Sequence, residues 1–260
     1  MKRALTIAGS DSGGGAGIQA DLKTFAAHGV YGTTAITAVT AQNTRGVTMF
    51  EAMSPELVVA QIAAVVADFG IDAAKTGMLA NAGIVEAVAG ALAAHRIPCV
   101  VVDPVMVAKS GARLIDDSAL RAVTQRLLRH ASVVTPNIPE AETLADMSIA
   151  SDGDRYEAAR RIADFGPAAV IVKGGHFPTS DVVDLLYESG EFVEFRHPRV
   201  PGRHTHGTGC TFSAALAAQI ALGRTLREAI PLAQQYIAGA IGRAPGIGAG
   251  HGPMDHFWKT

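Results

Sequence analysis

Short apolar runs alternate with longer helical patterns along most of this chain. Val100–Val102, Val133–Val134 and residues 170–172 are purely apolar, as expected for strands that are covered on both faces. Ile18, Leu22 and similar apolar residues elsewhere recur at helical spacing. Strands that alternate with helices favour a mainly parallel central sheet with helices on both faces. The sequence therefore predicts an α/β fold in which one sheet lies between two helical layers.

The 260 residues show no internal repeat, linker or low-complexity segment, so we expect a single domain spanning residues 1–260. Residues 188–191 read Glu-Ser-Gly-Glu between two apolar runs, which is typical of a β-hairpin. Two final helices are expected at about residues 208–222 and 226–243.

Charge and cysteine content exclude several classes of partner. Lys+Arg (22) nearly balance Asp+Glu (24), which argues against nucleic acid or an anionic membrane surface as a partner. Two cysteines cannot form a disulfide framework, and no apolar run approaches the length of a membrane-spanning helix. We therefore expect a soluble, cytoplasmic protein.

Polar residues and glycines recur where the predicted strands end. In open parallel sheets, ligands collect at the carboxyl ends of the strands. The recurrence therefore predicts a ligand site at this edge of the sheet. The segments are Gly9-Ser10-Asp11, Lys75-Thr76-Gly77, Asp103-Pro104, Thr135-Pro136-Asn137 and Lys173-Gly174-Gly175.

The first glycine-rich loop, residues 9–17, follows a strand and opens a helix. It is not a Walker loop, because no lysine follows Gly14, and it lacks the third glycine of the dinucleotide pattern, where Ile18 stands. One interpretation is a flexible turn with a helix cap. The other is a close approach of the backbone to a small ligand.

The turn Gly207-Thr208-Gly209-Cys210 opens a long helix rich in small apolar residues. Its glycines allow backbone N–H groups to converge, and a helix N-terminus carries positive partial charge. This arrangement suits phosphoryl transfer, which depends on positioning and charge stabilisation. Cys210 is either a small buried residue at a helix start or a reactive thiol favoured by that position.

Four further residues fit phosphate chemistry. Asn137 could be only a helix cap, and Lys173 only a lysine with its stem buried and its charge in water. Alternatively, Glu140 could order the water shell of Mg²⁺, and Lys173 could neutralise phosphate. Asp103 ends a wholly apolar strand, where a metal or phosphate role is favoured over a solvated charge.

Four segments together resemble the hydroxymethylpyrimidine/phosphomethylpyrimidine kinases of thiamine biosynthesis, within the ribokinase-like superfamily. The resemblance runs nearly end to end. The most specific segment is residues 8–24, AGSDSGGGAGIQADLKT, and the others are residues 37–44, 101–106 and 205–210, which read TAVTAQNT, VVDPVM and THGTGC.

The resemblance implies a ribokinase-like three-layer α/β/α sandwich, usually a homodimer, that uses ATP and Mg²⁺. It implies two successive phosphorylations of 4-amino-5-hydroxymethyl-2-methylpyrimidine, to the monophosphate and then the diphosphate. Gln42 would pair with the pyrimidine edge, Asp21 would lie near the hydroxymethyl end, and Met78 and Val105 would line the ring pocket. Lys109, in a flap at residues 108–111, could reach phosphate.

The expected chemistry assigns Cys210 to accept the alcohol proton and the N–H groups of residues 207–210 to bind the transferring phosphate. Glu140 and Asp103 would organise Mg²⁺, while Asn137, Thr208, Lys109 and Lys173 would bind the nucleotide. Most ribokinase-like enzymes carry Asp where this chain has Cys210, but the pyrimidine-kinase branch uses Cys. His204 stands where the pattern has Asn.

Three alternatives remain open from the sequence. A pyridoxal or pyridoxine kinase has the same fold and a ring substrate with a hydroxymethyl group, although Gln42 and Cys210 favour the pyrimidine. A non-catalytic pyrimidine sensor would have no need of Lys173, Glu140 and the anion-binding turn. A dinucleotide-dependent oxidoreductase is disfavoured by the failed glycine pattern.

Overall fold

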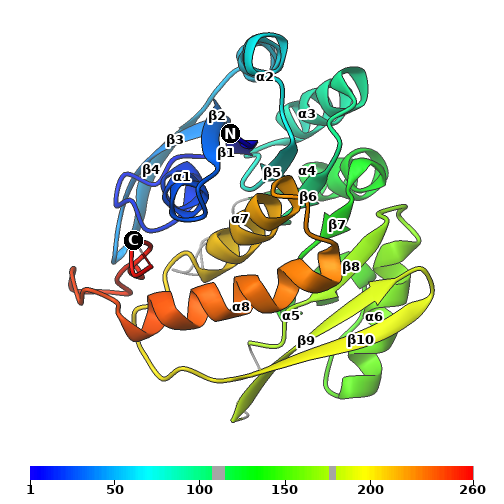
Figure 1. The fold of residues 1–260 in the computed structure, drawn as a ribbon. Coiled ribbons are helices and arrows are strands. Elements are labelled where there is room, and N and C mark those ends of the chain that lie inside the picture. Colours follow the sequence, from blue (N-terminus) through cyan, green and yellow to red (C-terminus); the bar gives the residue numbers. More distant parts are fainter. Residues whose placement is uncertain (107–114, 176–179, 260) are drawn as a thin grey trace.

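The protein was analysed as a computed structural model that describes residues 1–106, 115–175 and 180–259. Its main sheet has eight strands in the order β10-β9-β8-β7-β6-β5-β1-β2 (Figure 1). Within this sheet, the six neighbouring strands run parallel to one another, in the order β8, β7, β6, β5, β1 and β2. The strands β9 and β10 form an antiparallel hairpin at one edge. The bounds are β1 Arg3–Ala8, β2 Tyr31–Ile36, β5 Ala73–Thr76, β6 Val100–Val102, β7 Val133–Val134, β8 Ala169–Val172, β9 Asp181–Glu188 and β10 Glu191–Pro198.

Helices cover both faces of this sheet (Figure 1). The helices α1, α7 and α8 pack on one face, and the remaining helices pack on the other. Their bounds are α1 Gly17–Ala27, α2 Pro55–Phe69, α3 Ala82–His95, α4 Asp117–Ala122, a π-helical turn Val123–Leu127, a 3₁₀ turn Leu128–His130, α5 Ile138–Ala145, α6 Asp152–Ala163, α7 Thr208–Ala221 and α8 Leu226–Gly242.

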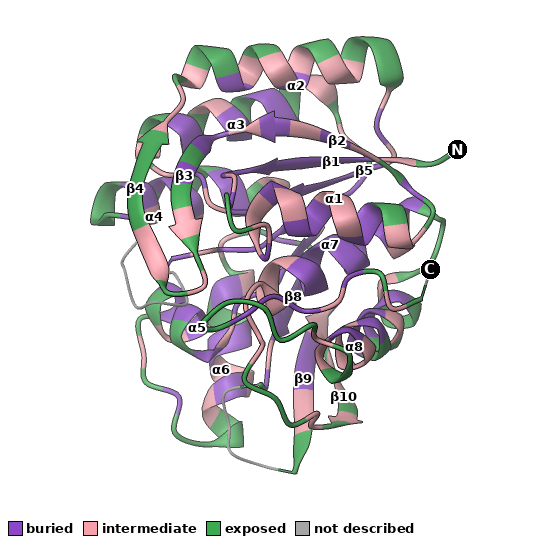
Figure 2. Ribbon diagram, turned by 90° about the vertical axis from the view of Figure 1, so that its left-hand side faces the viewer, coloured by how far each residue is buried: buried purple, intermediate pink, exposed green. Residues whose placement is uncertain are grey.

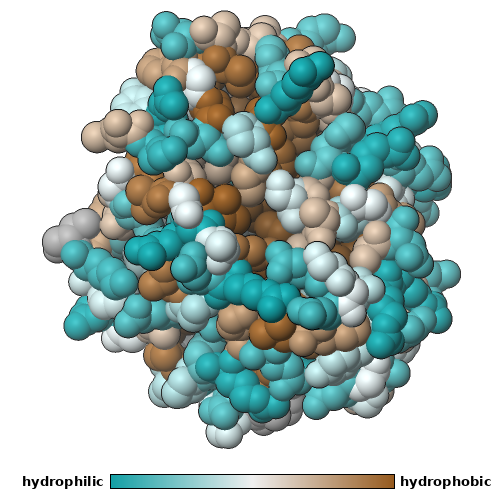
Figure 3. All heavy atoms as spheres, turned by 45° about the vertical axis from the view of Figure 1, so that its right-hand side comes forward, coloured by the Kyte–Doolittle hydropathy of each residue, from teal (hydrophilic) through white to brown (hydrophobic). Residues whose placement is uncertain are grey.

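Each side of the sheet has its own hydrophobic core. Successive strand residues point to opposite faces, so Val100 and Val102 pack in one core while Val101 packs in the other. The central strands β5, β6, β7 and β8 are therefore buried along their length, whereas the outward helix faces are exposed (Figure 2). On the face drawn in Figure 3, hydrophilic residues surround a smaller area where hydrophobic residues reach the surface. The predicted three-layer α/β/α sandwich is confirmed.

A second, two-stranded sheet projects from the edge of the main sheet. It consists of β3 (Ala38–Asn43) and β4 (Gly46–Ala52), paired antiparallel with a register shift between Ala41 and Gln42. The shift bends the strand locally, as β-bulges do. The hairpin thereby brings Gln42 to the edge where the parallel strands end.

No described helix is both long enough and apolar enough to cross a membrane.

Candidate active site

A cavity of about 910 Å³ lies at the carboxyl ends of the parallel strands. This is near the upper end of the size range of small-molecule sites. Residues that follow β1, β5, β6, β7 and β8 all line it, together with the hairpin β3–β4 and the start of α7. The sequence prediction of a site at this edge of the sheet agrees with that position.

The turn at the start of α7 is held against the first glycine-rich loop. Gly207 adopts φ +81, a left-handed conformation, and a Cβ atom there would overlap the carbonyl oxygen of Gly15. Only glycine meets both conditions without strain. The Thr208 hydroxyl donates to the carbonyl oxygen of Thr205 at 2.9 Å and completes the turn. The first-turn N–H groups of α7 therefore face the cavity as a helix N-terminus that can bind an anion.

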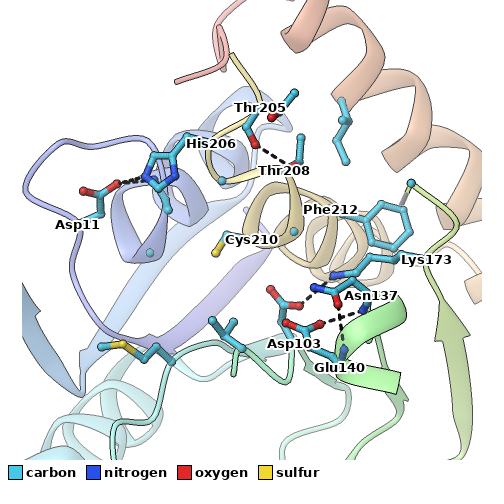
Figure 4. A pocket seen from close by; sticks show the side chains of 18 of the residues that line it. Asp11, Asp103, Asn137, Glu140, Lys173, Thr205, His206, Thr208, Cys210 and Phe212 are labelled. Atoms are coloured by element: carbon cyan, nitrogen blue, oxygen red, sulfur yellow. Dashed lines mark hydrogen bonds and ion pairs between the residues drawn. The ribbon is translucent and has the colours of Figure 1, made fainter. Parts of the chain in front are cut away.

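Asp11 fastens the glycine-rich loop to the same turn. Its carboxylate accepts the backbone N–H groups of Gly13, Gly15 and Ala16 at 2.8, 3.0 and 2.8 Å. His206 Nε2 lies 2.9 Å from Asp11 Oδ2 (Figure 4). Burial tends to raise the pKa of Asp11, but His206 and these N–H groups outweigh burial and lower that pKa. The loop is thus an ordered wall of the cavity.

Lys173 and Asp103 lie beside the anion-binding turn. Lys173 Nζ is 3.2 Å from Asp103 Oδ1, and a Cβ atom at Gly209 would lie 3.4 Å from the same Nζ. Burial would lower the pKa of Lys173, but Asp103 and Glu140 outweigh burial and raise it. Lys173 therefore stays charged where a phosphate bound by the turn would lie.

Asn137 and Glu140 form a capping box at the start of α5. Asn137 Oδ1 accepts the Glu140 N–H at 3.0 Å, and Glu140 Oε2 accepts the Asn137 N–H at 2.8 Å. Burial raises the pKa of Glu140 to about 7, against the opposing effect of Lys173. Figure 4 shows Asp103, Asn137, Glu140 and Lys173 as one group. Asn137 caps the helix and also lines the cavity.

Cys210 projects between this group and the Asp11–His206 pair in Figure 4. The backbone N–H of Gly17, at the start of α1, favours the thiolate form of Cys210. Burial nevertheless raises the Cys210 pKa to about 11, with Lys75 opposing that effect. In the ligand-free cavity at neutral pH, Cys210 is therefore a thiol.

Three residues assigned to the ring by the resemblance also line the cavity, namely Gln42, Met78 and Val105. The Gln42 backbone N–H donates to Ser12 Oγ at 2.7 Å, and its side-chain nitrogen lies 3.3 Å from His206 Nε2. The amide is therefore held next to the anion-binding turn.

Asp21 is placed differently from the other predicted residues. It is fully buried, does not itself line the cavity, and binds Lys75, which does line it. Sequence reasoning named Lys75 only as part of a polar strand end and gave it no role. Lys109 and its flap lie outside the described residues.

The carboxylates offer a limited set of metal ligands. Within residues 1–106, 115–175 and 180–259, no cluster of three or more His, Cys, Asp or Glu side chains is arranged to hold a metal ion. Asp103 and Glu140 alone would suit an ion that keeps most of its water, as Mg²⁺ does.

Comparison with known proteins gives one consistent family. The family model for phosphomethylpyrimidine kinase matches residues 11–255. The hydroxymethylpyrimidine/phosphomethylpyrimidine kinase of Bacillus subtilis is 48% identical over 256 residues, covering 98% of this chain and 94% of that protein. The crystal structure of phosphomethylpyrimidine kinase from Clostridium difficile has a TM-score of 0.83 at 40% identity, covering 93% of this chain and all of that one. A Staphylococcus aureus pyridoxal kinase, in complex with AMP-PCP and pyridoxal, has a TM-score of 0.90 at 35% identity, covering 99% of this chain and 94% of that one.

Proposed function

The chain belongs to the phosphomethylpyrimidine kinase family, and on that premise we propose how it carries out two successive phosphoryl transfers. The enzyme is a kinase that uses ATP. Its substrate is 4-amino-5-hydroxymethyl-2-methylpyrimidine, which is converted to the monophosphate and then to the diphosphate for thiamine diphosphate synthesis. This proposal rests on one observation: the anion-binding turn, the charged Lys173 and the Gln42 amide all line one cavity.

The nucleotide phosphates bind at the start of α7. Backbone N–H groups of residues 207–210 receive the transferring phosphoryl group, and Lys173 offsets its charge. Asn137 and the Thr208 hydroxyl contribute polar contacts on the nucleotide side of the cavity. These groups are fixed before substrate arrives, because the helix cap and the Asp11–His206 contact hold their backbone in place.

Asp103 and Glu140 are the residues that would hold Mg²⁺, directly or through its waters. The raised pKa of Glu140 supports this fit: the carboxyl group is buried beside Asp103 as well as Lys173, so a further cation would favour its ionised form. When bound, Mg²⁺ would neutralise phosphate charge.

In the first transfer, the substrate alcohol oxygen forms a bond to the γ-phosphorus as the bond to the β,γ-bridging oxygen breaks. ADP is the leaving group, and the alcohol proton passes to Cys210 in its thiolate form, which becomes a neutral thiol. In the second transfer the acceptor is a phosphate oxygen that is already ionised, so no base is required. Because the pKa of Cys210 is about 11, only a small fraction of this residue is thiolate at neutral pH. The first step therefore depends on how nearby charges stabilise that thiolate.

Gln42 recognises the substrate ring through hydrogen bonds. Its amide supplies one donor and one acceptor, the complement of an aminopyrimidine edge. Met78 and Val105 provide apolar contacts to the ring faces, and Asp21 acts on the hydroxymethyl end through Lys75.

A pyridoxal kinase is the second candidate, because pyridoxal kinases share the fold closely. The test is to measure kcat/KM for the pyrimidine and for pyridoxal in the wild type and in Gln42→Leu. We expect the wild type to prefer the pyrimidine and the variant to lose about 10- to 100-fold on it, since a hydrogen-bonded pair is lost, with ATP KM unchanged. A wild-type preference for pyridoxal would overturn the assignment, and tight pyrimidine binding without ATP consumption would indicate a sensor.

We further propose that the enzyme works as a cytoplasmic homodimer. The hairpin β3–β4 exposes Val39 and Met49, at 48% and 71% of their surface, and the strand register places both on the same face of the hairpin, an apolar face suited to burial by a second copy. Sedimentation analysis should give twice the mass of one chain, and Met49→Lys should shift it toward the monomer.

A further inference from the structure

Lys75 and Asp21 form a buried ion pair directly beneath the cavity. Lys75 Nζ lies 2.9 Å from Asp21 Oδ2 and 3.2 Å from Oδ1, and both side chains are fully buried. Thr6 Oγ1 donates to Asp21 Oδ2 at 2.6 Å. Burial would lower the pKa of Lys75, but Asp21 outweighs burial and raises it. The ammonium is therefore a permanent positive charge.

The stability of the fold does not account for the presence of this buried ion pair. Buried ion pairs replaced by apolar side chains of similar volume usually leave stability unchanged or improved, because two charges must be desolvated. Here the strand around Lys75 is otherwise apolar or neutral and wholly buried. Gly77 also leaves room for the ammonium, since a Cβ atom there would lie 2.8 Å from Lys75 Nζ. The backbone is thus adapted to the charge.

The pair lies close to the turn that carries Cys210. Asp21 is on α1 and Lys75 is on β5, and α7, which begins with that turn, packs against both elements. Lys75 and Cys210 line the same cavity. The residue that carries the ammonium and the residue that carries the thiol therefore border one space.

Lys75 has a donor left for the cavity. Its ammonium carries three N–H groups, and among the described residues Asp21 is its only hydrogen-bond acceptor. Four charged groups act on the Cys210 thiol: Asp21 from α1, Lys75 from β5, Asp103 after β6 and Lys173 after β8. Lys75 favours the thiolate, whereas Asp21 and Asp103 oppose it.

We propose that Lys75 is a positioning residue for Cys210. Asp21 holds the Lys75 ammonium in place, and the ammonium stabilises the thiolate that accepts the alcohol proton of the substrate. This inference deepens the proposed function and rests on it for the identity of the proton donor. The bond changes remain those of the first transfer. Lys75 contributes charge alone and keeps its own protons.

The test measures the ionisation of Cys210 without any substrate. In a Cys99→Ala background, so that Cys210 is the one remaining thiol, the rate of alkylation by iodoacetamide is followed by mass spectrometry from pH 7 to 11. Lys75→Met leaves the Asp21 charge buried and can prevent folding. The informative variant is therefore Lys75→Met/Asp21→Asn, a neutral pair of nearly the same shape. Circular dichroism and thermal melting confirm its fold.

We expect the double variant to fold and its alkylation at pH 9 to slow by about three- to tenfold, because Lys75 favours the thiolate more than Asp21 opposes it. The rate of the first phosphoryl transfer should fall by a similar factor, with less effect on the second transfer and on ATP KM. An unchanged alkylation profile would overturn the inference, because a purely structural pair would leave thiol ionisation unaltered. That failure is distinguishable from failure of the proposed function, in which the wild type does not phosphorylate the pyrimidine while the thiol titration still shifts.

Discussion

His256 connects the C-terminal segment to the helix that carries the anion-binding turn. It is 2% exposed, and its Nε2 lies 3.0 Å from the hydroxyl oxygen of Thr211 in the first turn of α7. The Tyr236 hydroxyl donates to the His256 carbonyl oxygen at 2.6 Å. The same segment accepts the His206 N–H through the carbonyl oxygen of Gly252. Loss of this connection would loosen the turn that binds phosphate.

Burial makes the connection sensitive to acid. Burial, with a contribution from Lys23, lowers the pKa of His256 from 6.5 to about 4. In the unfolded chain His256 is therefore protonated below pH 6.5, whereas in the folded protein it is protonated only below about pH 4. The free energy of unfolding falls as the pH drops through that window, because the unfolded chain binds the proton more tightly. The limit is about 3 kcal/mol, and the loss at pH 5 is about 2 kcal/mol.

The assay is urea unfolding at pH 8 and pH 5, for the wild type and for His256→Gln. Glutamine can keep a hydrogen bond to Thr211 but does not titrate in this range. Other acid-sensitive groups are common to both proteins, so the wild type should lose about 2 kcal/mol more than the variant over this interval. Equal losses in the two proteins would refute the reasoning, because His256 would then contribute nothing to the pH dependence.

Three further predictions concern the phosphate end of the site. Cys210→Ala should slow the first transfer by about 10²- to 10⁴-fold and the second far less, measured separately on the pyrimidine and its monophosphate; equal losses would count against Cys210 as a base. At limiting Mg²⁺ the wild-type rate should rise with pH through about 7, as Glu140 ionises, and Glu140→Gln should remove that rise; a retained pH dependence would assign it to another group. Gly207→Ala should cost at least about 1–3 kcal/mol of stability and abolish transfer, because of its left-handed φ and the nearby Gly15 carbonyl; an unchanged melting temperature would contradict this.

Local sequence patterns predicted the buried strands well. β6 and β7 begin and end where the apolar runs do, and the β9–β10 turn falls at Ser189-Gly190 as expected. These runs are entirely apolar because both of their faces are covered, so their assignment as buried strands is unambiguous. Residues 120–128 have helical apolar spacing, yet the stretch 117–130 comprises α4, a π-helical turn and a 3₁₀ turn. Hydrophobic spacing indicates which face is buried but does not specify which carbonyl each N–H reaches.

Contacts between residues far apart in the chain could not be predicted from the sequence. β4 was not predicted, because Thr48, Met49 and Phe50 are all exposed and show no alternation. The pairs Lys75–Asp21 and His206–Asp11 join residues 54 and 195 positions apart. Each partner stands at a polar strand end or in a glycine-rich segment, which indicated a site but not the contacts within it. The position of Asp21 beneath the cavity, with Lys75 above it, required the fold.

The most direct test of the account follows the products of one reaction over time. Purified protein, ATP, Mg²⁺ and 4-amino-5-hydroxymethyl-2-methylpyrimidine are mixed and sampled by ³¹P NMR and mass spectrometry. We predict that the monophosphate appears first and is then converted to the diphosphate, with one ADP formed at each step. Unconsumed ATP in the presence of the pyrimidine, together with rapid phosphorylation of pyridoxal under the same conditions, would contradict the central claim.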